Sequence, residues 1–359
     1  MQLAGAKRIV AAALGAALIV GCAGSPGAGT ATPPVAGPAA TPVASPAATP
    51  VAGPAKAVKL TLNYLVGGPQ IGFMYAKKLG YYSQAGLDVT IEEGQGSATT
   101  AQLLASGKTD IGFSDAPAIM AVRAKGGAIK IIAPILQTNG FAIMSLKESN
   151  VTKVKDLLGK TIAVQPGTAQ TALLDAVFLA NGMDKSQVTV VNIAPAALVG
   201  SLLQKQVDAI LGGADFQGVQ ITDRGVQINT LYYKDIGVPT VGLSLAANED
   251  LIKKDPDMLT KFVAASLKGW DAARKDPKAG AEAIIEQFPN AGTAAQFQKQ
   301  AEIDFLLLCG PGAKNLGLVP TENWGKTYDL LTKYQSLPTA QPITDYYTEQ
   351  FVPKTGPGC

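Results

Sequence analysis

The side chains that carry out most enzyme chemistry are scarce in this chain of 359 residues. It has no histidine and only three cysteines, Cys22, Cys309 and Cys359. Without histidine, Ser-His and Cys-His nucleophile pairs cannot form and the commonest metal ligand is missing. The amides, hydroxyls and carboxyls that remain suit hydrogen bonding to a ligand. The sequence therefore favours a binding protein over an enzyme, and we expect neither a metal nor a cofactor.

The charge balance argues against nucleic acid as a partner. Lys and Arg number 30 against 27 Asp and Glu, and only 16% of the residues are charged. Two of the positive residues, Lys7 and Arg8, stand at the very start of the chain, so the remainder is nearly neutral. A nucleic-acid-binding surface needs a clear basic excess, which this chain lacks.

The first residues have the pattern of a secretory signal. Lys7 and Arg8 precede an uncharged, mostly apolar run over residues 9–20, which is too short to span a bilayer of about 30 Å. Ile19-Val20-Gly21-Cys22 resembles the lipobox at which bacterial lipoproteins are cleaved and lipidated. This resemblance implies a signal peptide over residues 1–21 and a lipid on Cys22. The lipid would hold the protein on the extracytoplasmic side of the cell membrane.

A tether follows the lipobox. Residues 23–55 contain no charge and are almost entirely Ala, Pro, Gly, Thr, Ser and Val, with the near-repeat ATPVASPA, ATPVAGPA. Such a composition cannot bury a core, and its regularly spaced prolines favour an extended, semi-rigid linker. We therefore predict a disordered Pro/Ala-rich linker over residues 22–56, with the folded part over residues 57–359.

Strand-like and helix-like runs alternate from residue 58 onward. VKLTLNYLV, LDVTIEE and DIGFS are typical of strands with helices between them, which predicts βαβ units and a largely parallel sheet. The pattern then repeats, because TTAQLLASGKTDIGFSD, with Asp110 and Asp115, is matched by VGSLLQKQVDAILGGAD, with Asp208 and Asp215. TIAVQPG should lead into one long helix that ends near Ala180. Two similar α/β lobes are expected.

The C-terminal third is predicted to be mainly helical. Asp255-Pro256 and Asp276-Pro277 are typical helix starts, with Asp as the N-cap and Pro at the first helical position. These helices should pack back onto the first lobe. We place lobe 1 at about 57–139 and 241–359 and lobe 2 at about 140–240. The two chain crossings, near residues 138–141 and 238–242, would act as a hinge beside a cleft.

Three stretches carry a resemblance to a known family. YAKKLGYYSQAGLDVTIEEGQGS, LLASGKTDIGFSD and VKDLLGKTIAVQPGT occur in the order found in solute-binding proteins of bacterial ABC importers. The branch concerned includes binders of thiamine pyrimidine precursors, riboflavin, nitrate and alkanesulfonates. The resemblance implies the two-lobe type II periplasmic-binding-protein fold, a monomer, and an ABC permease with its ATPase subunit as partners. No phosphate-binding G-x-x-x-x-G-K-[ST] motif occurs in the chain itself.

In that architecture, ligand contacts come from loops at the carboxyl ends of strands on both sides of the cleft. On this basis the candidate ligand-binding residues are Asn63, Tyr64, Gln70, Ser97, Ser114, Asp115, Gln137, Asn139, Gly167, Thr168, Asp215 and Tyr232. The four arginines, at positions 8, 123, 224 and 274, fall outside these loops. Amide, hydroxyl and aromatic side chains suit a neutral heteroaromatic ligand, and the overall resemblance is closest to riboflavin-binding lipoproteins.

Other functions remain open at this stage. A thiamine pyrimidine precursor is the first alternative ligand, and nitrate or an alkanesulfonate the second. A lipoprotein that presents a ligand to a surface sensor, or a pyrimidine synthase of the same fold, would be a different class of protein. The missing histidine argues against the synthase. Cys309 and Cys359 either pair in a disulfide in an oxidising compartment, or Cys309 is a buried free thiol beside a mobile tail.

Overall fold

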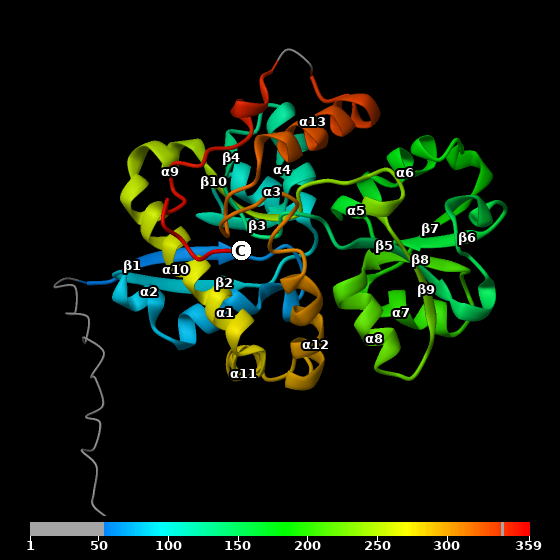
Figure 1. Cartoon of the computed structure of the whole chain (residues 1–359), viewed down its shortest axis with the longest axis horizontal. Helices are drawn as coiled ribbons and strands as arrows, with labels where there is room; N and C mark the ends of the chain where they lie inside the picture. Colours follow the sequence, from blue (N-terminus) through cyan, green and yellow to red (C-terminus); the bar gives the residue numbers. More distant parts are fainter. Residues whose placement is uncertain (1–53, 339–340) are drawn as a thin grey trace, which may run out of the picture. The chain divides into compact units, whose positions relative to one another are not determined.

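The structure is a computed structural model that describes residues 54–338 and 341–359. The signal peptide expected over residues 1–21, the lipidation site Cys22 and all but the last residues of the predicted linker lie outside the described residues. Within the described ranges, no helix combines the length and apolar character needed to cross a membrane. The described residues form two five-stranded sheets, which occupy separate halves of Figure 1.

The first sheet has the strand order β2-β1-β3-β10-β4. Its strands are β1 (Lys56–Thr61), β2 (Leu87–Glu92), β3 (Ile111–Asp115), β4 (Ile129–Pro134) and β10 (Leu243–Asn248). The helical segments between them are η1 (Gly68–Gln70), α1 (Ile71–Lys78), α2 (Tyr81–Gln84), α3 (Ser97–Ala105) and α4 (Ala116–Ala124). We call this sheet and the helices packed on it lobe 1.

The second sheet, with the order β7-β6-β8-β5-β9, forms lobe 2. Its strands are β5 (Phe141–Leu146), β6 (Thr161–Val164), β7 (Thr189–Asn192), β8 (Ala209–Gly213) and β9 (Ile228–Tyr232). Its α-helices are α5 (Ala169–Ala172), α6 (Leu174–Ala180), α7 (Pro195–Leu203) and α8 (Val219–Thr222). Short 3-10 turns are η2 (Lys147–Ser149), η3 (Val154–Leu157), η4 (Lys185–Gln187) and η6 (Tyr233–Asp235), and η5 (Ala214–Gly218) is a π-helical turn.

The two lobes repeat one topology, as the duplicated sequence pattern predicts. Strand β1 is parallel to β2 and β3, and β6 is parallel to β7 and β8. In lobe 1 the carboxylate of Asp110 accepts a hydrogen bond from the Lys59 backbone N–H at 2.8 Å. In lobe 2 Asp208 accepts one from the Thr161 N–H, also at 2.8 Å. The paired aspartates therefore tie equivalent strands together, and the two-lobe α/β fold is confirmed.

The prediction of largely parallel sheets is wrong in one respect. Strand β10 is antiparallel to β3 and β4, and β5 is antiparallel to β8 and β9. Each of these strands enters its sheet directly after the chain has crossed from the other lobe, so no crossover helix sets its direction. Residue patterns locate a strand but do not encode the direction from which the chain arrives.

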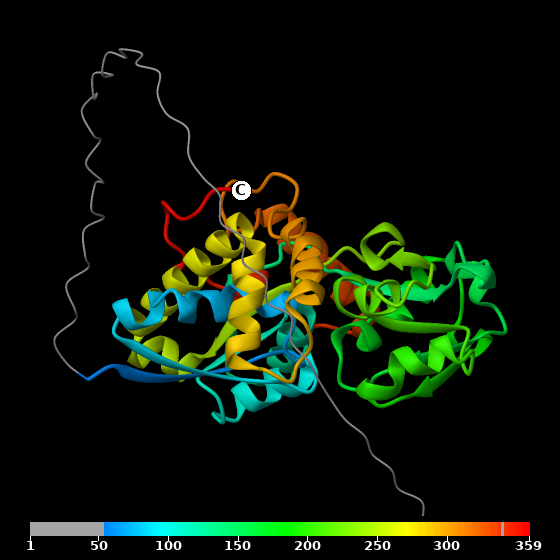
Figure 2. The same ribbon diagram turned by 90° about the horizontal axis from the view of Figure 1, so that it is seen from below.

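Helices of the C-terminal third pack on lobe 1, and the last two of them also contact helical segments of lobe 2. They are α9 (Glu249–Lys254), α10 (Pro256–Lys275), α11 (Pro277–Gln287), α12 (Ala294–Phe305) and α13 (Thr321–Gln335), followed by the turn η7 (Ile343–Asp345). The predicted N-caps are confirmed: Asp255 accepts from the Met258 N–H and Asp276 from the Ala279 N–H, each at 3.0 Å. In Figures 1 and 2 the yellow helices α9 and α10 lie with the blue strands of lobe 1.

The core of lobe 1 is built around Trp270 of α10. Its ring is fully buried and meets Phe73 edge-on at 5.8 Å, and Phe73 in turn meets Phe113 of β3 at 4.7 Å. A Cβ atom on Gly72 would lie 2.3 Å from the Trp270 ring, so α1 can approach α10 this closely only with glycine at that position. This packing fixes α1, and with it the loop that enters the cleft described below.

Two hydrogen-bonded segments connect the lobes, over residues 135–140 and 236–242. The Asn139 N–H donates to the Thr240 carbonyl at 3.1 Å, and the Asn139 side chain donates to the Thr240 hydroxyl at 2.8 Å. The Gly242 N–H donates to the Leu136 carbonyl at 3.0 Å. The two crossing segments thus form a paired ribbon, which is the arrangement expected of a hinge.

Candidate ligand-binding cleft

A cavity of about 70 Å³ lies between the lobes, beside the crossing segments. We call this cavity and its lining residues the cleft. Its lobe 1 side includes the loop after β1, the end of β3 and the start of α3, and its lobe 2 side includes η5 and the loop before α5. The lining residues are Asn63, Tyr64, Pro69, Gln70, Gly96, Ser97, Asp115, Leu136, Asn139, Gly140, Phe141, Thr168, Gln170, Gly213, Asp215, Phe216, Gln217 and Leu243.

Asn63, Tyr64 and Gln70 come from the loop between β1 and α1. The Gln70 side chain is buried and fixes this loop, because its amide N–H donates to the Asn63 side chain at 2.9 Å and its carbonyl accepts from the Gly67 N–H at 2.9 Å. The loop is therefore rigid on its inner side. Asn63 and Tyr64 present their side chains to the cleft from this support.

Tyr64 links the two lobes directly. Its hydroxyl donates to the Gln165 side-chain oxygen of lobe 2 at 2.6 Å. Its ring meets Phe216 of η5 edge-on, with centroids 5.4 Å apart. Burial raises the pKa of the Tyr64 phenol to about 12, so the hydroxyl stays a donor at physiological pH. Two aromatic rings from opposite lobes thus meet edge to face in the cleft.

Asp115 and Ser97 form a buried pair on the lobe 1 side. The Ser97 hydroxyl donates to the Asp115 carboxyl at 2.6 Å, and burial raises the pKa of Asp115 to about 7. Ser114 is also buried, but its hydroxyl donates to the Ser97 carbonyl at 2.8 Å and it does not line the cleft. Adjacent residues of a strand point to opposite faces, which accounts for the different fates of Ser114 and Asp115.

On the lobe 2 side, Thr168 caps α5, and its hydroxyl accepts from the Thr171 N–H at 3.4 Å. Gln170 and Gln217 also line the cleft, although the strand-end argument did not select them. Gln170 lies in α5 and Gln217 in η5, each a few residues after the preceding strand ends, and both short helical segments border the cleft. The Gln217 side-chain oxygen accepts from the Gly213 N–H at 2.8 Å, which fixes η5 against the end of β8.

Asp215 faces the cleft, and a second carboxyl stands behind it. Asp304 of α12 is fully buried, and its carboxyl lies against that of Asp215. Burial raises the pKa of Asp215, and burial together with the neighbouring Asp215 raises the pKa of Asp304 well above its usual range. Sequence reasoning missed Asp304. The sequence signal that could have found it is the spacing of Phe297, Ala301 and Asp304, which places Asp304 on the buried face of a helix.

Three other candidates lie outside the cleft. The Gln137 side chain is buried and accepts from the Gly310 N–H at 3.1 Å and donates to the Asn315 carbonyl at 3.2 Å. It borders a separate cavity of about 460 Å³ near the crossing segments. Gly167, with φ +79°, accepts from the Ala98 N–H across the lobes at 3.1 Å. Tyr232, at the end of β9, lies with its ring 5.3 Å from the Lys234 ammonium.

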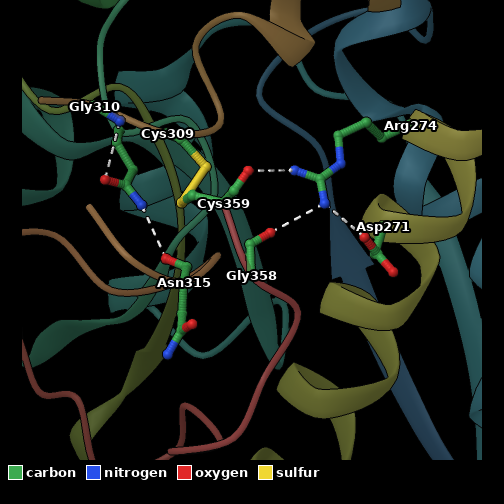
Figure 3. Close-up of a disulfide and its surroundings, with 8 residues drawn as sticks. Asp271, Arg274, Cys309, Gly310, Asn315, Gly358 and Cys359 are labelled. Atoms are coloured by element: carbon green, nitrogen blue, oxygen red, sulfur yellow. Dashed lines mark hydrogen bonds and ion pairs between the residues drawn. A yellow bond between two sulfur atoms is a disulfide. The ribbon is translucent and has the colours of Figure 1, made fainter. Parts of the chain in front are cut away.

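Cys309 and Cys359 form a disulfide in the structure, with Cα atoms 5.8 Å apart (Figure 3). The Arg274 guanidinium of α10 donates to the Gly358 carbonyl at 3.0 Å and to Asp271 at 2.7 Å. The C-terminal tail is thereby attached to lobe 1 at two points. Because Gln137 contacts the residue that follows Cys309, this attachment also supports one crossing segment.

Every charged residue that lines the cleft is acidic. Asp115 and Asp215 line it, and no lysine or arginine of the described ranges does so. In the same ranges, no group of three or more His, Cys, Asp and Glu side chains is placed to hold a metal ion. The arrangement can therefore do one thing well: enclose a ligand between aromatic rings, amides, hydroxyls and two carboxyls.

Solved structures with the same architecture include solute-binding proteins. The aliphatic sulphonate binding protein SsuA of Escherichia coli matches with a TM-score of 0.62 at 16% identity, covering 82% of this chain and 92% of that one. The nitrate-binding protein NrtA of Synechocystis also gives 0.62, at 13% identity, over 83% and 87%. At this identity the likeness establishes the fold alone, which is that of the periplasmic binding proteins.

The chain belongs to the NMT1/THI5-like family, whose profile matches residues 69–280. It is 23% identical to the riboflavin-binding protein RibY of Chloroflexus aurantiacus over 82% of this chain and 86% of that protein. It is 26% identical to a formylaminopyrimidine-binding protein of Halalkalibacterium halodurans over 57% and 63%. It is also 22% identical to the 4-amino-5-hydroxymethyl-2-methylpyrimidine phosphate synthase THI11 of Saccharomyces cerevisiae, over 80% and 90%.

Proposed function

We propose that this protein is the solute-binding subunit of an ABC importer and captures a neutral heteroaromatic vitamin or precursor, with riboflavin as the first choice. The observation that carries the proposal is the composition of the cleft. Two aromatic rings from opposite lobes, Tyr64 and Phe216, meet there among amide and hydroxyl side chains, with no lysine or arginine in the lining. Clamping of a sulfonate or nitrate typically uses such cations.

The chemistry of a flavin matches this lining. Its tricyclic ring offers a flat apolar face to Tyr64 and Phe216, its uracil-like edge pairs with amides such as Asn63 and Gln170, and its ribityl hydroxyls suit side chains such as Thr168. Kinship to RibY supports the choice. An aminopyrimidine precursor of thiamine is the second candidate, and kinship to the formylaminopyrimidine-binding protein supports it equally.

Capture requires the lobes to move. A cavity of about 70 Å³ holds a few water molecules but not a tricyclic ring, so a flavin can enter only when the lobes separate. The paired crossing segments at residues 135–140 and 236–242 allow such a rotation, and the Tyr64–Gln165 hydrogen bond is one contact that opening would break. Closure around the ligand would then signal occupancy to the permease and its ATPase subunit.

The proposal includes membrane attachment. A lipid on Cys22 and a linker over residues 22–56 would hold the two-lobe domain on the extracytoplasmic side of the cell membrane, near the permease. The sequence pattern of residues 7–22 supports this placement. We propose no catalytic role, because the chain lacks the histidine that acid–base or nucleophilic chemistry commonly uses.

Flavin fluorescence tests the proposed ligand. Titration of riboflavin with the purified protein should quench the fluorescence saturably, since a ring stacked on an aromatic side chain is normally quenched. Tyr64→Leu should weaken binding roughly tenfold, because one stacking face is lost, whereas Tyr64→Phe keeps the ring and serves as the matched control. Absence of quenching, with binding of 4-amino-5-hydroxymethyl-2-methylpyrimidine instead, would replace riboflavin by the second candidate.

A further inference from the structure

Asp304 is a buried carboxyl that does not line the cleft and therefore has no role in the ligand contacts proposed above. It is 0% exposed, on the face of α12 that also carries Phe297, Gln300 and Ala301. Neither of its carboxyl oxygens receives a hydrogen bond from an N–H or O–H donor of the described residues. The polar group beside it is the Asp215 carboxyl of η5, a lobe 2 turn that packs against α12. The contact therefore crosses from one lobe to the other.

Two carboxyl groups in contact need a shared proton. Each carboxylate only accepts hydrogen bonds, so buried contact between them is stable when one is protonated and donates to the other. Asp304 is the more deeply buried member, with no exposed surface against 7% for Asp215. The Asp215 carboxyl is also stabilised by the backbone N–H groups of Asp215 and Phe216. Asp304 therefore holds the proton, and Asp215 carries the negative charge at the cleft.

The surroundings leave this charge uncompensated. Among the elements packed against α12, η1 and α8 have no charged side chain, η5 carries only Asp215, and the charged residues of α11 are exposed. Lys299 of α12 itself forms an ion pair with Asp223, which follows α8. The other titratable groups near Asp215 are the Asp115 carboxyl and the Tyr232 phenol, neither of which is a cation. A ligand in the cleft thus faces an unpaired carboxylate.

We propose that Asp215, positioned by the Asp304 carboxyl behind it, is the specificity-determining group of the cleft and selects a neutral or cationic ligand edge that presents N–H donors. The inference rests on the ligand-binding role proposed above and deepens it. An imide N–H or an amino group beside a ring nitrogen would donate to Asp215. A nitrate or sulfonate would place a second negative charge against a desolvated carboxylate, which is strongly unfavourable.

Asp304 acts through Asp215 and is a positioning residue. In Asp304→Asn, the amide can still donate to Asp215 but cannot ionise, so the variant mimics the protonated carboxyl. In Asp304→Leu, the donor is lost and Asp215 is left without support. Glu302→Gln, two residues away on the exposed face of α12, removes one negative charge from the same helix and is the matched control.

Binding of riboflavin, of its N3-methyl derivative and of 4-amino-5-hydroxymethyl-2-methylpyrimidine should be measured calorimetrically between pH 5 and pH 9. For the wild type and Glu302→Gln we expect affinity to fall about tenfold per pH unit once Asp304 ionises, because two adjacent charges displace Asp215. Asp304→Asn should keep the low-pH affinity and lose this fall. Asp304→Leu, checked for folding by thermal unfolding, should bind about tenfold more weakly at every pH.

The outcomes separate this inference from the choice of ligand. If riboflavin binds and its N3-methyl derivative binds at least about tenfold more weakly, the result supports both riboflavin as the ligand and the role of the carboxyl pair. Equal binding of the two flavins, with the same pH profile in Asp304→Asn as in the wild type, overturns the role of the carboxyl pair and leaves riboflavin as the ligand. Binding of the aminopyrimidine alone, with the Asp304 effects intact, rejects riboflavin and supports the pair. Tight binding of nitrate or taurine overturns both.

Discussion

Asp115 ends strand β3 with its carboxyl buried and hydrogen-bonded to the Ser97 hydroxyl. Burial raises its pKa from 3.8 to about 7. Between these two pH values the folded protein binds more protons than the unfolded chain at this site. Stability is therefore lost as pH rises from about 4 to about 7, by up to about 1.4 kcal/mol per pH unit.

Asp115→Asn should remove this part of the pH dependence. The amide oxygen can still accept from Ser97, and no charge is buried at neutral pH. We expect the free energy of unfolding of the variant, relative to wild type, to be higher at pH 8 than at pH 5, as measured by urea denaturation. Asp88→Asn, at an exposed position of β2, is the control and should show no such difference. If the free energy of unfolding changed with pH equally in Asp115→Asn and in wild type, Asp115 would not be the source of this pH dependence.

The local sequence predicted which side chains lie at strand ends but not which way those side chains point. Asn63 and Asp215 follow strands and Asp115 ends one, and the structure brings them together because both lobes turn the same strand ends toward the cleft. Ser114 points to the opposite face, and the Gln137 side chain accepts a hydrogen bond from Gly310, the residue after Cys309. Asp304 could not be selected from strand ends, because it lies behind Asp215 through the packing of helix α12, and it is 89 residues further along the chain than Asp215.

Helix α11 begins at an N-cap that can be tested directly. The Asp276 carboxylate accepts from the Ala279 N–H at 3.0 Å, ahead of Pro277 at the first helical position. Asp276→Ala should lower the free energy of unfolding by about 1 kcal/mol, because a backbone N–H loses its partner. Asp276→Asn retains an acceptor and should change stability by only a few tenths of a kcal/mol. Equal loss in both variants would show that the charge, and not the cap, is responsible.

The disulfide should contribute through the loop that it closes. Cys309 and Cys359 are 50 residues apart in the sequence. Cross-links over such distances stabilise by about 2–4 kcal/mol, so the double variant Cys309→Ser, Cys359→Ser should melt roughly 3–6 °C lower in calorimetry. Wild-type protein kept in reductant should behave like the double variant. A melting temperature that neither treatment changes would mean that Arg274 alone secures the tail.

Elements with local signals were predicted well, and the others were not. Helix α10 begins and ends where its Asp-Pro caps and apolar spacing predict. The predicted single helix up to Ala180 is wrong, because the structure breaks it at Leu173 into α5 and α6. No Gly or Pro marks the break; the Thr171 hydroxyl instead bonds to the Gln165 carbonyl at 2.8 Å, a contact set by the folded loop.

For the whole molecule, the duplicated Leu-Leu and Asp pattern was enough to predict two similar lobes. The direction of β5 and β10 was not predictable, since it depends on how the chain crosses between the lobes. Opening about that crossing is a property of the complete chain. Small-angle scattering should show a smaller radius of gyration with saturating riboflavin than without it. The same radius in both conditions would reject closure as the response to ligand.

Direct comparison of ligands tests the central claim, that the cleft binds a donor-bearing heteroaromatic compound and not an anion. Calorimetric titrations of the purified protein with riboflavin, 4-amino-5-hydroxymethyl-2-methylpyrimidine, taurine and nitrate should be run at one pH and ionic strength. We predict one-site binding of a heteroaromatic ligand, riboflavin first, with no heat from either anion. Saturable binding of taurine or nitrate, with neither heteroaromatic bound, would contradict the account.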